Sequence, residues 1–135
     1  MPSLHPLRWS LCLLTFAVAC SSGTPAPATA SPDAAATLPD RDPALAHELI
    51  EQRGGVLLDV RTPEEYEAGH IEGAHNVPHD QVPAQLAEIE RLTEGNRDTP
   101  IVVYCGSGRR AAIAKETLVK DGYSQVTNLG GKDDW

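Results

Sequence analysis

The chain has 135 residues, of which 41% are hydrophobic and 22% charged, and this composition is typical of one globular domain with its own core. Aromatic residues make up 4%, so we expect an aliphatic core. The formal net charge of −8 disfavours nucleic acid and anionic membrane surfaces as partners. An acidic surface either keeps a domain soluble or forms a docking face. The sequence favours the first role because it contains no long block of like charge.

Residues 1–20 have the order of an export signal, with Arg8 ahead of a short apolar run at residues 11–18 and small residues after it. The run is far shorter than the ~20 residues that span a bilayer, so we expect a cleaved signal peptide rather than a structural helix. Its removal leaves 10 basic and 19 acidic residues, a net charge of −9.

The end of this leader resembles the bacterial lipobox, in which the signal is cut before a cysteine and the new N-terminal thiol is lipidated. Cys20 is that cysteine here, although Ala17 stands where the box usually has Leu. We expect lipidation of Cys20, and Ser21 in place of Asp indicates sorting to the outer membrane. The alternative is ordinary cleavage after Ala19 with release as a soluble periplasmic or secreted protein. Both the lipidated and the simply cleaved form predict a domain outside the cytoplasm, and the lipidated form places it on the periplasmic side of the cell envelope.

Residues 21–40 consist mostly of Ser, Thr, Ala, Pro and Gly, which predicts a flexible tether, and the folded domain is expected at residues 41–135. Cys12 leaves with the signal and Cys20 lies at its end. Cys105 is therefore the only thiol of the predicted domain. A lone cysteine forms no internal disulfide, so it is either a buried apolar residue or a reactive group.

Predicted helices and strands alternate through the domain. Asp42 and Pro43 begin a helix that ends at Gly54, and Thr62 begins a short helix with Glu65 in a capping box. The other expected elements are strands at residues 56–60, 75–77, 101–104 and 126–129 and helices at residues 80–92 and 111–120. This alternation predicts a parallel α/β sheet with helices on both faces. Its ligand crevice should lie beyond the carboxyl ends of the strands.

A glycine-rich and arginine-rich loop follows the predicted strand at residues 101–104, where it meets the next helix. Backbone N–H groups and the helix dipole favour negative charge at such a junction, and this environment lowers cysteine pKa values from about 8.5 to about 3.5–7.5. A buried hydrophobic cysteine would not explain two glycines and two arginines beside it. We therefore predict a nucleophile followed by substrate-binding residues, in the order Cys105, Gly106, Ser107, Gly108, Arg109, Arg110.

This loop resembles the active loop of the rhodanese family, C-x-x-G-x-R, which Cys105, Gly108 and Arg110 match. Further family motifs follow the family's order: D-V-R at residues 59–61, E-[FY]-x-x-G-H-I at 65–71, G-A-x-N-[IV]-P at 73–78 and G-G-x-x-x-W at 130–135. The set spans residues 56–135 and is most similar to the small single-domain periplasmic rhodaneses of the phage-shock type. Family members commonly continue past the position of Trp135 into a last helical stretch.

The resemblance implies a rhodanese-like α/β fold, with a parallel sheet of about five strands flanked by helices on both faces. It also implies a thiosulfate sulfurtransferase without a cofactor. In the family's reaction, a thiolate at Cys105 attacks the outer sulfur of thiosulfate, releases sulfite and holds a persulfide for cyanide or a thiol. Arg110 is expected to bind the anion, and Arg109 to assist at the rim. We expect a monomer whose partners are a small anionic sulfur donor and a thiophilic acceptor.

Three further residues are expected to support the loop rather than to react. Asp59 and Arg61 can pair locally at a strand end and fix the segment that follows. His70 is expected to be a hydrogen-bond partner, because a stabilised thiolate needs no general base. His75 and His79 lack the spacing of metal ligands, so we expect no metal site.

Three other functions are compatible with parts of this pattern. A cysteine phosphatase would place its arginine six residues after the cysteine, where this chain has Ala111, and Arg110 lies five residues after it. A binding or sensing module of the same fold would not need Cys105. A sulfur-relay protein that receives persulfide sulfur from another protein would have the same sequence features as an enzyme that uses small molecules.

Overall fold

The computed structural model describes residues 38–135. The predicted signal peptide, Cys20 and residues 21–37 of the predicted tether lie outside the described residues. Within residues 38–135, no helix has both the length and the apolar character that a membrane crossing requires.

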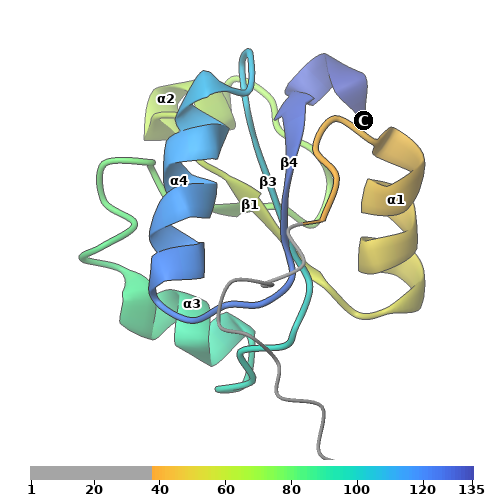
Figure 1. Ribbon diagram of the computed structural model, residues 1–135. Coiled ribbons are helices and arrows are strands. Elements are labelled where there is room, and N and C mark those ends of the chain that lie inside the picture. The colour runs from red at the N-terminus through yellow and green to blue at the C-terminus, as the bar shows by residue number, and fades with distance from the viewer. Residues whose placement is uncertain (1–37) are drawn as a thin grey trace, which may run out of the picture.

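A parallel sheet of four strands forms the centre of the domain (Figure 1). Its order is β2-β1-β3-β4, and each neighbouring pair is parallel. The strands are β1 (Val56–Asp59), β2 (His75–Asn76), β3 (Ile101–Cys105) and β4 (Val126–Gly131). The parallel α/β sheet is confirmed, and it has the four strands that the residue pattern predicted, where the family resemblance implied about five.

Residues 39–41 occupy the place of a further strand along the outer edge of β4. The main-chain N–H of Arg41 donates to the carbonyl of Asn128 at 2.8 Å. The neighbouring bond, however, is made by a side chain, because the Asp40 carboxylate accepts from the Asn128 N–H at 2.9 Å. Thr127 donates its hydroxyl to the Pro39 carbonyl at 2.6 Å. This segment is held to the sheet without the regular backbone ladder of a strand.

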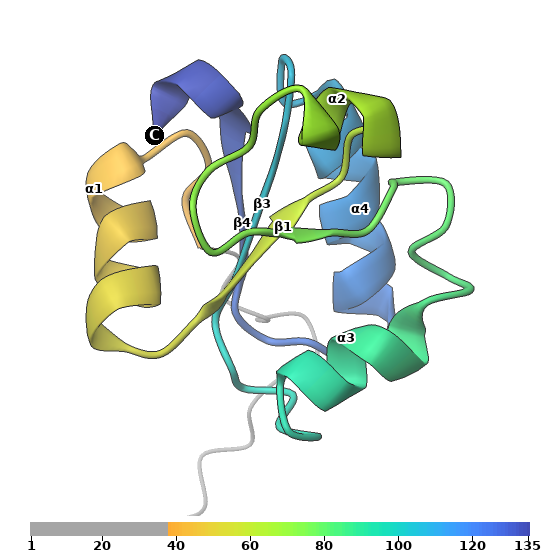
Figure 2. The same ribbon diagram turned by 180° about the vertical axis from the view of Figure 1, so that it is seen from behind.

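Helices cover both faces of the sheet, as Figures 1 and 2 show from opposite sides. On one face α1 (Pro43–His47) continues into the π-helical turn η1 (Glu48–Gln52). The other face is covered by α3 (Leu86–Leu92) and α4 (Arg109–Lys120). The short α2 (Pro63–Glu67) lies near the carboxyl ends of the strands, and η2 (Lys132–Asp134) follows β4.

Each face has its own hydrophobic core. Because successive strand residues point to opposite faces, Leu58 and Val103 pack towards α4, whereas Leu57 and Val102 pack towards α1. Most of the buried residues are aliphatic, as predicted, although Tyr104 and Tyr123 are among the largest fully buried side chains.

The predicted capping box of α2 is confirmed: Glu65 N–H donates to the Thr62 hydroxyl at 3.4 Å, and Thr62 N–H donates to the Glu65 carboxylate at 3.2 Å. The predicted helix at residues 80–92 is wrong in its first half, because α3 begins only at Leu86. Pro83 explains the difference, since proline lacks an N–H and disfavours helical backbone in the residue before it.

Candidate active site

Cys105 is the last residue of β3 and lies where the sheet meets the start of α4. Its side chain packs in the core on the α4 side and the residue is 1% exposed. The N–H of Gly108 donates to Cys105 Sγ at 3.0 Å, across a turn of three residues. The thiol is therefore buried and hydrogen-bonded by its own loop.

Two opposing effects set the pKa of the Cys105 thiol. Burial raises it, and N–H groups of the loop and of the first turn of α4 lower it by more, so the pKa lies below the ordinary value. These donors belong to Ser107, Ala111, Gly108 and Arg110. N–H groups that face the sulfur stabilise a thiolate, and they would equally stabilise an anion bound to it.

The rear of the loop rests on an irregular part of β4. The register of β4 against β3 shifts between Val103 and Tyr104, which marks a β-bulge. Beside it, the Asn128 side chain donates to the Gly108 carbonyl at 2.9 Å and accepts from the Gly130 N–H at 3.0 Å. Asn128 thus ties the loop to the strand behind it.

Arg110 makes a two-pronged ion pair with Glu65 of α2. Its guanidinium nitrogens lie 2.6 Å and 2.9 Å from the two carboxylate oxygens. This contact lowers the pKa of Glu65 to about 2 and raises that of Arg110, to which the nearby Cys105 also contributes. Arg110 is therefore close to the thiol, and Glu65 neutralises part of its charge. Figure 1 shows α2 beside the first turn of α4.

The other predicted loop residues form the outer rim. Gly106 and Ser107 are exposed, and Arg109, the first residue of α4, is exposed as well. Arg41, which precedes α1, donates from Nη2 to the Ser107 carbonyl at 3.2 Å. Of the predicted residues, Ser107, Gly108 and Arg110 thus present N–H groups to the Cys105 sulfur, whereas Gly106 and Arg109 lie at the exposed surface beside it.

Asp59 and Arg61 form a buried pair at the end of β1. Arg61 donates to the Asp59 carboxylate from Nε at 3.0 Å and from Nη2 at 2.6 Å. The same Nη2 also donates to the Gly69 carbonyl at 2.8 Å, and the guanidinium carbon lies 5.7 Å from the centre of the Tyr104 ring. The pair links the strand end to the loop after α2, away from direct contact with Cys105.

His70 lies in that same loop and faces α2. Its Nδ1 lies 3.0 Å from the Tyr66 carbonyl, which can only accept, so this nitrogen donates. The His70 and Tyr66 rings stack with centroids 3.8 Å apart, and the Tyr66 hydroxyl donates to the Ala74 carbonyl at 2.8 Å. These contacts anchor His70, and the loop that contains it, to α2.

Residue-by-residue reasoning missed Glu65, Asn128 and Arg41 as neighbours of the loop. Glu65 belongs to the E-Y family motif, which marked it as a residue of interest. Its role in the capping box explained its presence, so its second contact, with Arg110, was not predicted. Asn128 and Arg41 carried no local signal, since their contacts depend on how β4 and the preceding segment pack.

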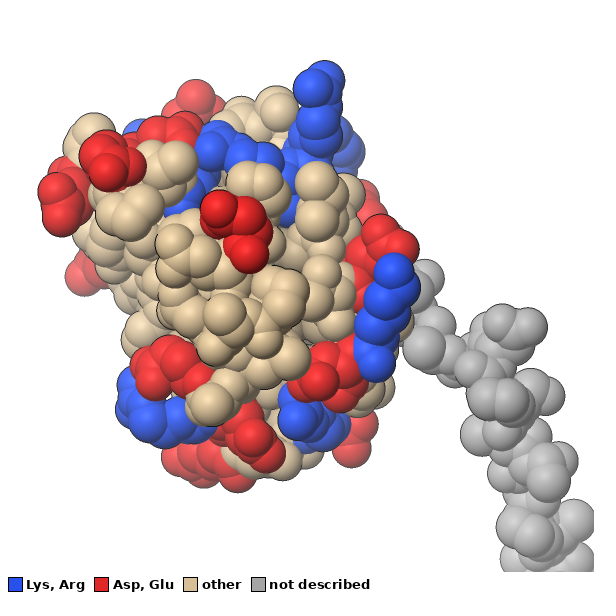
Figure 3. All heavy atoms as spheres, turned by 90° about the vertical axis from the view of Figure 1, so that its left-hand side faces the viewer, with Lys and Arg blue, Asp and Glu red and all other residues tan. Residues whose placement is uncertain are grey.

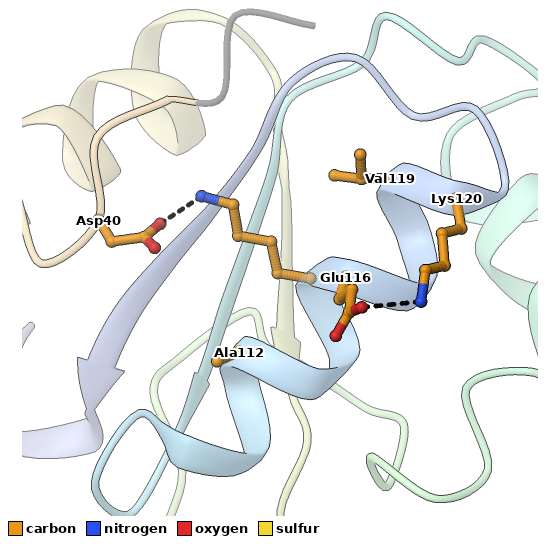
Figure 4. Close-up of a pocket in the computed structure, with 6 residues that line it drawn as sticks. Asp40, Ala112, Glu116, Val119 and Lys120 are labelled. Carbon is orange, nitrogen blue, oxygen red and sulfur yellow. Dashed lines mark hydrogen bonds and ion pairs between the residues drawn. The ribbon is translucent and has the colours of Figure 1, made fainter. Parts of the chain in front are cut away.

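A cavity of about 360 Å³ lies on the outer surface of α4, beside Asp40 (Figure 4). Lys115 and Asp40, which form an ion pair, both line it, and Ala112 and Val119 contribute apolar lining. None of its lining residues belongs to the loop from Cys105 to Arg110, so we assign it no part in the chemistry. Within residues 38–135, no three His, Cys, Asp or Glu side chains are grouped as a metal site would require.

Charges of both signs surround an uncharged central area on the side of the molecule that faces left in Figure 1 (Figure 3). On this face the acidic side chains are distributed among basic ones rather than gathered into one patch. This distribution is typical of a solvated surface.

The fold and the loop together define an α/β domain that presents a cysteine among inward-facing N–H groups. The chain belongs to the family of the Rhodanese-like domain, whose family model matches residues 42–135. Thiosulfate sulfurtransferase PspE of Escherichia coli is 38% identical over 77 residues, which cover 57% of this chain and 70% of that protein.

Two solved structures have the same fold. A rhodanese with anions from E. coli superposes with a TM-score of 0.54 at 36% identity, covering 60% of this chain and 91% of that one. The human single domain sulfurtransferase TSTD1 superposes with a TM-score of 0.57 at 28% identity, covering 73% of this chain and 91% of that one. The chain is thus a rhodanese-like protein, and its family consists broadly of sulfurtransferases.

Proposed function

We propose that this protein is a thiosulfate sulfurtransferase that works through a persulfide on Cys105. The observation that carries the proposal is the buried sulfur of Cys105, which accepts the Gly108 N–H at 3.0 Å in a loop whose N–H donors lower the thiol pKa. The likeness to a relative named thiosulfate sulfurtransferase supports the choice of donor.

The reaction has two balanced steps. The Cys105 thiolate attacks the outer sulfur of thiosulfate, a new S–S bond forms, and the original S–S bond breaks with its electron pair leaving on sulfite. The resulting persulfide is an anion, and the loop N–H groups that hold the thiolate would also stabilise it. Cyanide or a thiolate then attacks the outer sulfur, which leaves as thiocyanate or a new persulfide and restores the Cys105 thiolate.

Intact-protein mass spectrometry tests this directly. After incubation with thiosulfate, the wild-type chain should gain about 32 Da on Cys105, and addition of cyanide should remove this mass and yield thiocyanate. Cys105→Ser should show neither the gain nor the product. A wild-type chain that gains no sulfur at Cys105 would contradict the proposal.

The loop length argues against a phosphatase. The N–H groups of Gly108 and Arg110 face the Cys105 sulfur, and Arg110 follows the cysteine by five residues. A loop longer by one residue would be needed to surround a tetrahedral phosphate in the phosphatase manner. Hydrolysis of p-nitrophenyl phosphate at a rate lost in Cys105→Ser would favour that alternative.

We further propose that the protein acts in the cell envelope, exported by residues 1–20 and lipid-anchored to the outer membrane through Cys20. The lipobox-like leader supports this location. In a bacterial host the wild-type protein should fractionate with outer membranes and carry an acyl mass. Cys20→Ala should lose that mass. A wild-type protein that is soluble in the periplasm without acylation would favour simple secretion.

A further inference from the structure

We propose that Arg41, which lies just before the family match begins, is a positioning residue for the Cys105 thiolate. The inference deepens the proposed function, because it rests on Cys105 reacting as a thiolate. It is carried by one peptide group of the active loop, the group that joins Ser107 to Gly108.

The two ends of this peptide group are held from opposite sides. Its carbonyl, on Ser107, accepts a hydrogen bond from Arg41 Nη2 at 3.2 Å. Its N–H, on Gly108, donates to Cys105 Sγ at 3.0 Å. In a planar trans peptide the C=O and N–H bonds point in opposite directions, so a donor that holds the carbonyl outward also directs the N–H inward. Arg41 therefore acts on the sulfur through a single rigid group.

The charge of Arg41 strengthens the same contact. A cation on a carbonyl oxygen polarises the peptide group and makes its N–H a better donor. The Ser107–Gly108 peptide would thus transmit part of the Arg41 charge to the thiolate, and to the anionic persulfide that replaces it. The adjoining peptide is held separately, because the Asn128 side chain donates to the Gly108 carbonyl at 2.9 Å.

The backbone of Arg41 has an unusual conformation that contacts with β4 hold in place. Its φ of 60° lies in the left-handed region, which non-glycine residues adopt only when their surroundings compensate. The main-chain N–H of Arg41 donates to Asn128 O, and the preceding Asp40 carboxylate accepts from Asn128 N. Its side chain then passes Gly130, 3.9 Å from the position a Cβ would take there, before it reaches the loop.

The test measures the pH dependence of Cys105 alkylation by iodoacetamide in the full chain, followed at Cys105 by peptide mass spectrometry because Cys12 and Cys20 are also present. Arg41→Gly and Arg41→Asn both remove the guanidinium and both tolerate a positive φ. Arg53→Gly is the matched control: it removes an exposed arginine that contacts Gln125, at the opposite ends of the strands. The other charged residues around the loop and the strand ends beside it stay unchanged in all variants: Asp59, Arg61, Glu65, Arg109, Arg110 and Asp134.

Arg41→Gly and Arg41→Asn should move the alkylation midpoint to higher pH and slow alkylation at neutral pH about three- to tenfold, while Arg53→Gly matches wild type. The proposal requires this shift in each Arg41 variant that retains the wild-type unfolding transition. Wild-type midpoints in a folded Arg41 variant, or an equal shift in Arg53→Gly, would overturn it. Alkylation needs no sulfur donor, so a shift without a thiosulfate adduct would keep the positioning role and reject the proposed function.

Discussion

Glu65 holds Arg110 by two hydrogen bonds, at 2.6 Å and 2.9 Å, across the space between α2 and α4. The same carboxylate accepts the Thr62 N–H at the start of α2. One side chain therefore caps α2 and holds an arginine at the start of α4. The position of Arg110 near the thiol therefore depends on α2 as well as on α4, in whose first turn it lies.

Removing either partner of this pair should change the Cys105 pKa in opposite directions. Arg110→Ala deletes a cation near the sulfur, so the thiol pKa should rise. Glu65→Gln deletes the anion that offsets that cation, so the pKa should fall. Alkylation rates against pH would give both midpoints. The exposed pair of Glu88 and Arg91 on α3 provides the control, and equivalent changes there should leave the midpoint unchanged.

Arg110→Ala should also lower kcat/KM for thiosulfate by about one to two decades, the cost of one charge-assisted contact of roughly 1.5–3 kcal/mol. Arg109→Ala should cost less, because its exposed side chain lies at the rim. Steady-state rates of thiocyanate formation would rank the two variants. Equal activity of Arg110→Ala and wild type would mean that the loop N–H groups alone bind the anion.

Acid should weaken the contribution of Glu65 to stability within a defined pH window. The hydrogen bonds from Arg110 lower the pKa of Glu65 from 4.5 to about 2, so the folded state favours the carboxylate. This stabilisation is present above pH 4.5 and is lost as the pH falls towards 2. Urea midpoints of wild type and Glu65→Gln should therefore converge across that window. A difference that stays constant with pH would show that the pair does not couple to folding.

Asp59→Ala should destabilise the domain strongly. Asp59 is fully buried and Arg61 is 8% exposed, so the substitution leaves a buried guanidinium without its carboxylate, at a cost of about 3–5 kcal/mol. Urea unfolding would measure the loss. Glu88→Ala, which breaks an exposed pair, should change the midpoint far less. Similar midpoints for the two variants would argue against a structural role for the Asp59–Arg61 pair.

Gly108→Ala should impair both stability and Cys105 reactivity. Gly108 has a φ of 85°, and a Cβ there would lie 3.1 Å from Arg41 Nη2 and 3.2 Å from Gly130 Cα. Gly73→Ala is matched in backbone conformation, since its φ is 80°, but its Cβ would meet nothing within 4 Å. Both variants should lose about 1–3 kcal/mol from backbone strain, and only Gly108→Ala should also slow alkylation. Equal alkylation rates of the two variants would show that the protein relieves the crowding around a Cβ at residue 108 without moving the loop.

The elements that the sequence predicted well are those specified by local chemistry. Continuous aliphatic runs mark β1 and β3, and the Asp42 and Thr62 caps mark the starts of α1 and α2. The order of strand, loop and helix around Cys105 also followed from local sequence, because a strand, two glycines and a helix start are contiguous, although α4 begins at Arg109 rather than at the predicted residue 111. Pro83 was a local signal too, and neglecting it extended the predicted α3 too far.

What could not be predicted depends on packing between distant segments. The contact of Glu65 with Arg110 spans 45 residues, and that of Arg41 with Ser107 spans 66. No periodicity or spacing in the sequence links Glu65 to Arg110 or Arg41 to Ser107. The attachment of residues 39–41 to the edge of β4 could not be predicted for the same reason, because Asp40 binds the strand through its side chain rather than through a regular backbone ladder.

The attachment of residues 39–41 to β4 also bears on aggregation. β4 is an edge strand, and unpaired N–H and C=O groups at a sheet edge are open to pairing with another chain. Asp40 and Arg41 already use both main-chain groups of Asn128 on that side. A domain shortened to residues 42–135, the extent of the family match, would uncover this edge and favour intermolecular strand pairing. We therefore expect the residues that precede the family match to help keep the folded domain from associating with itself.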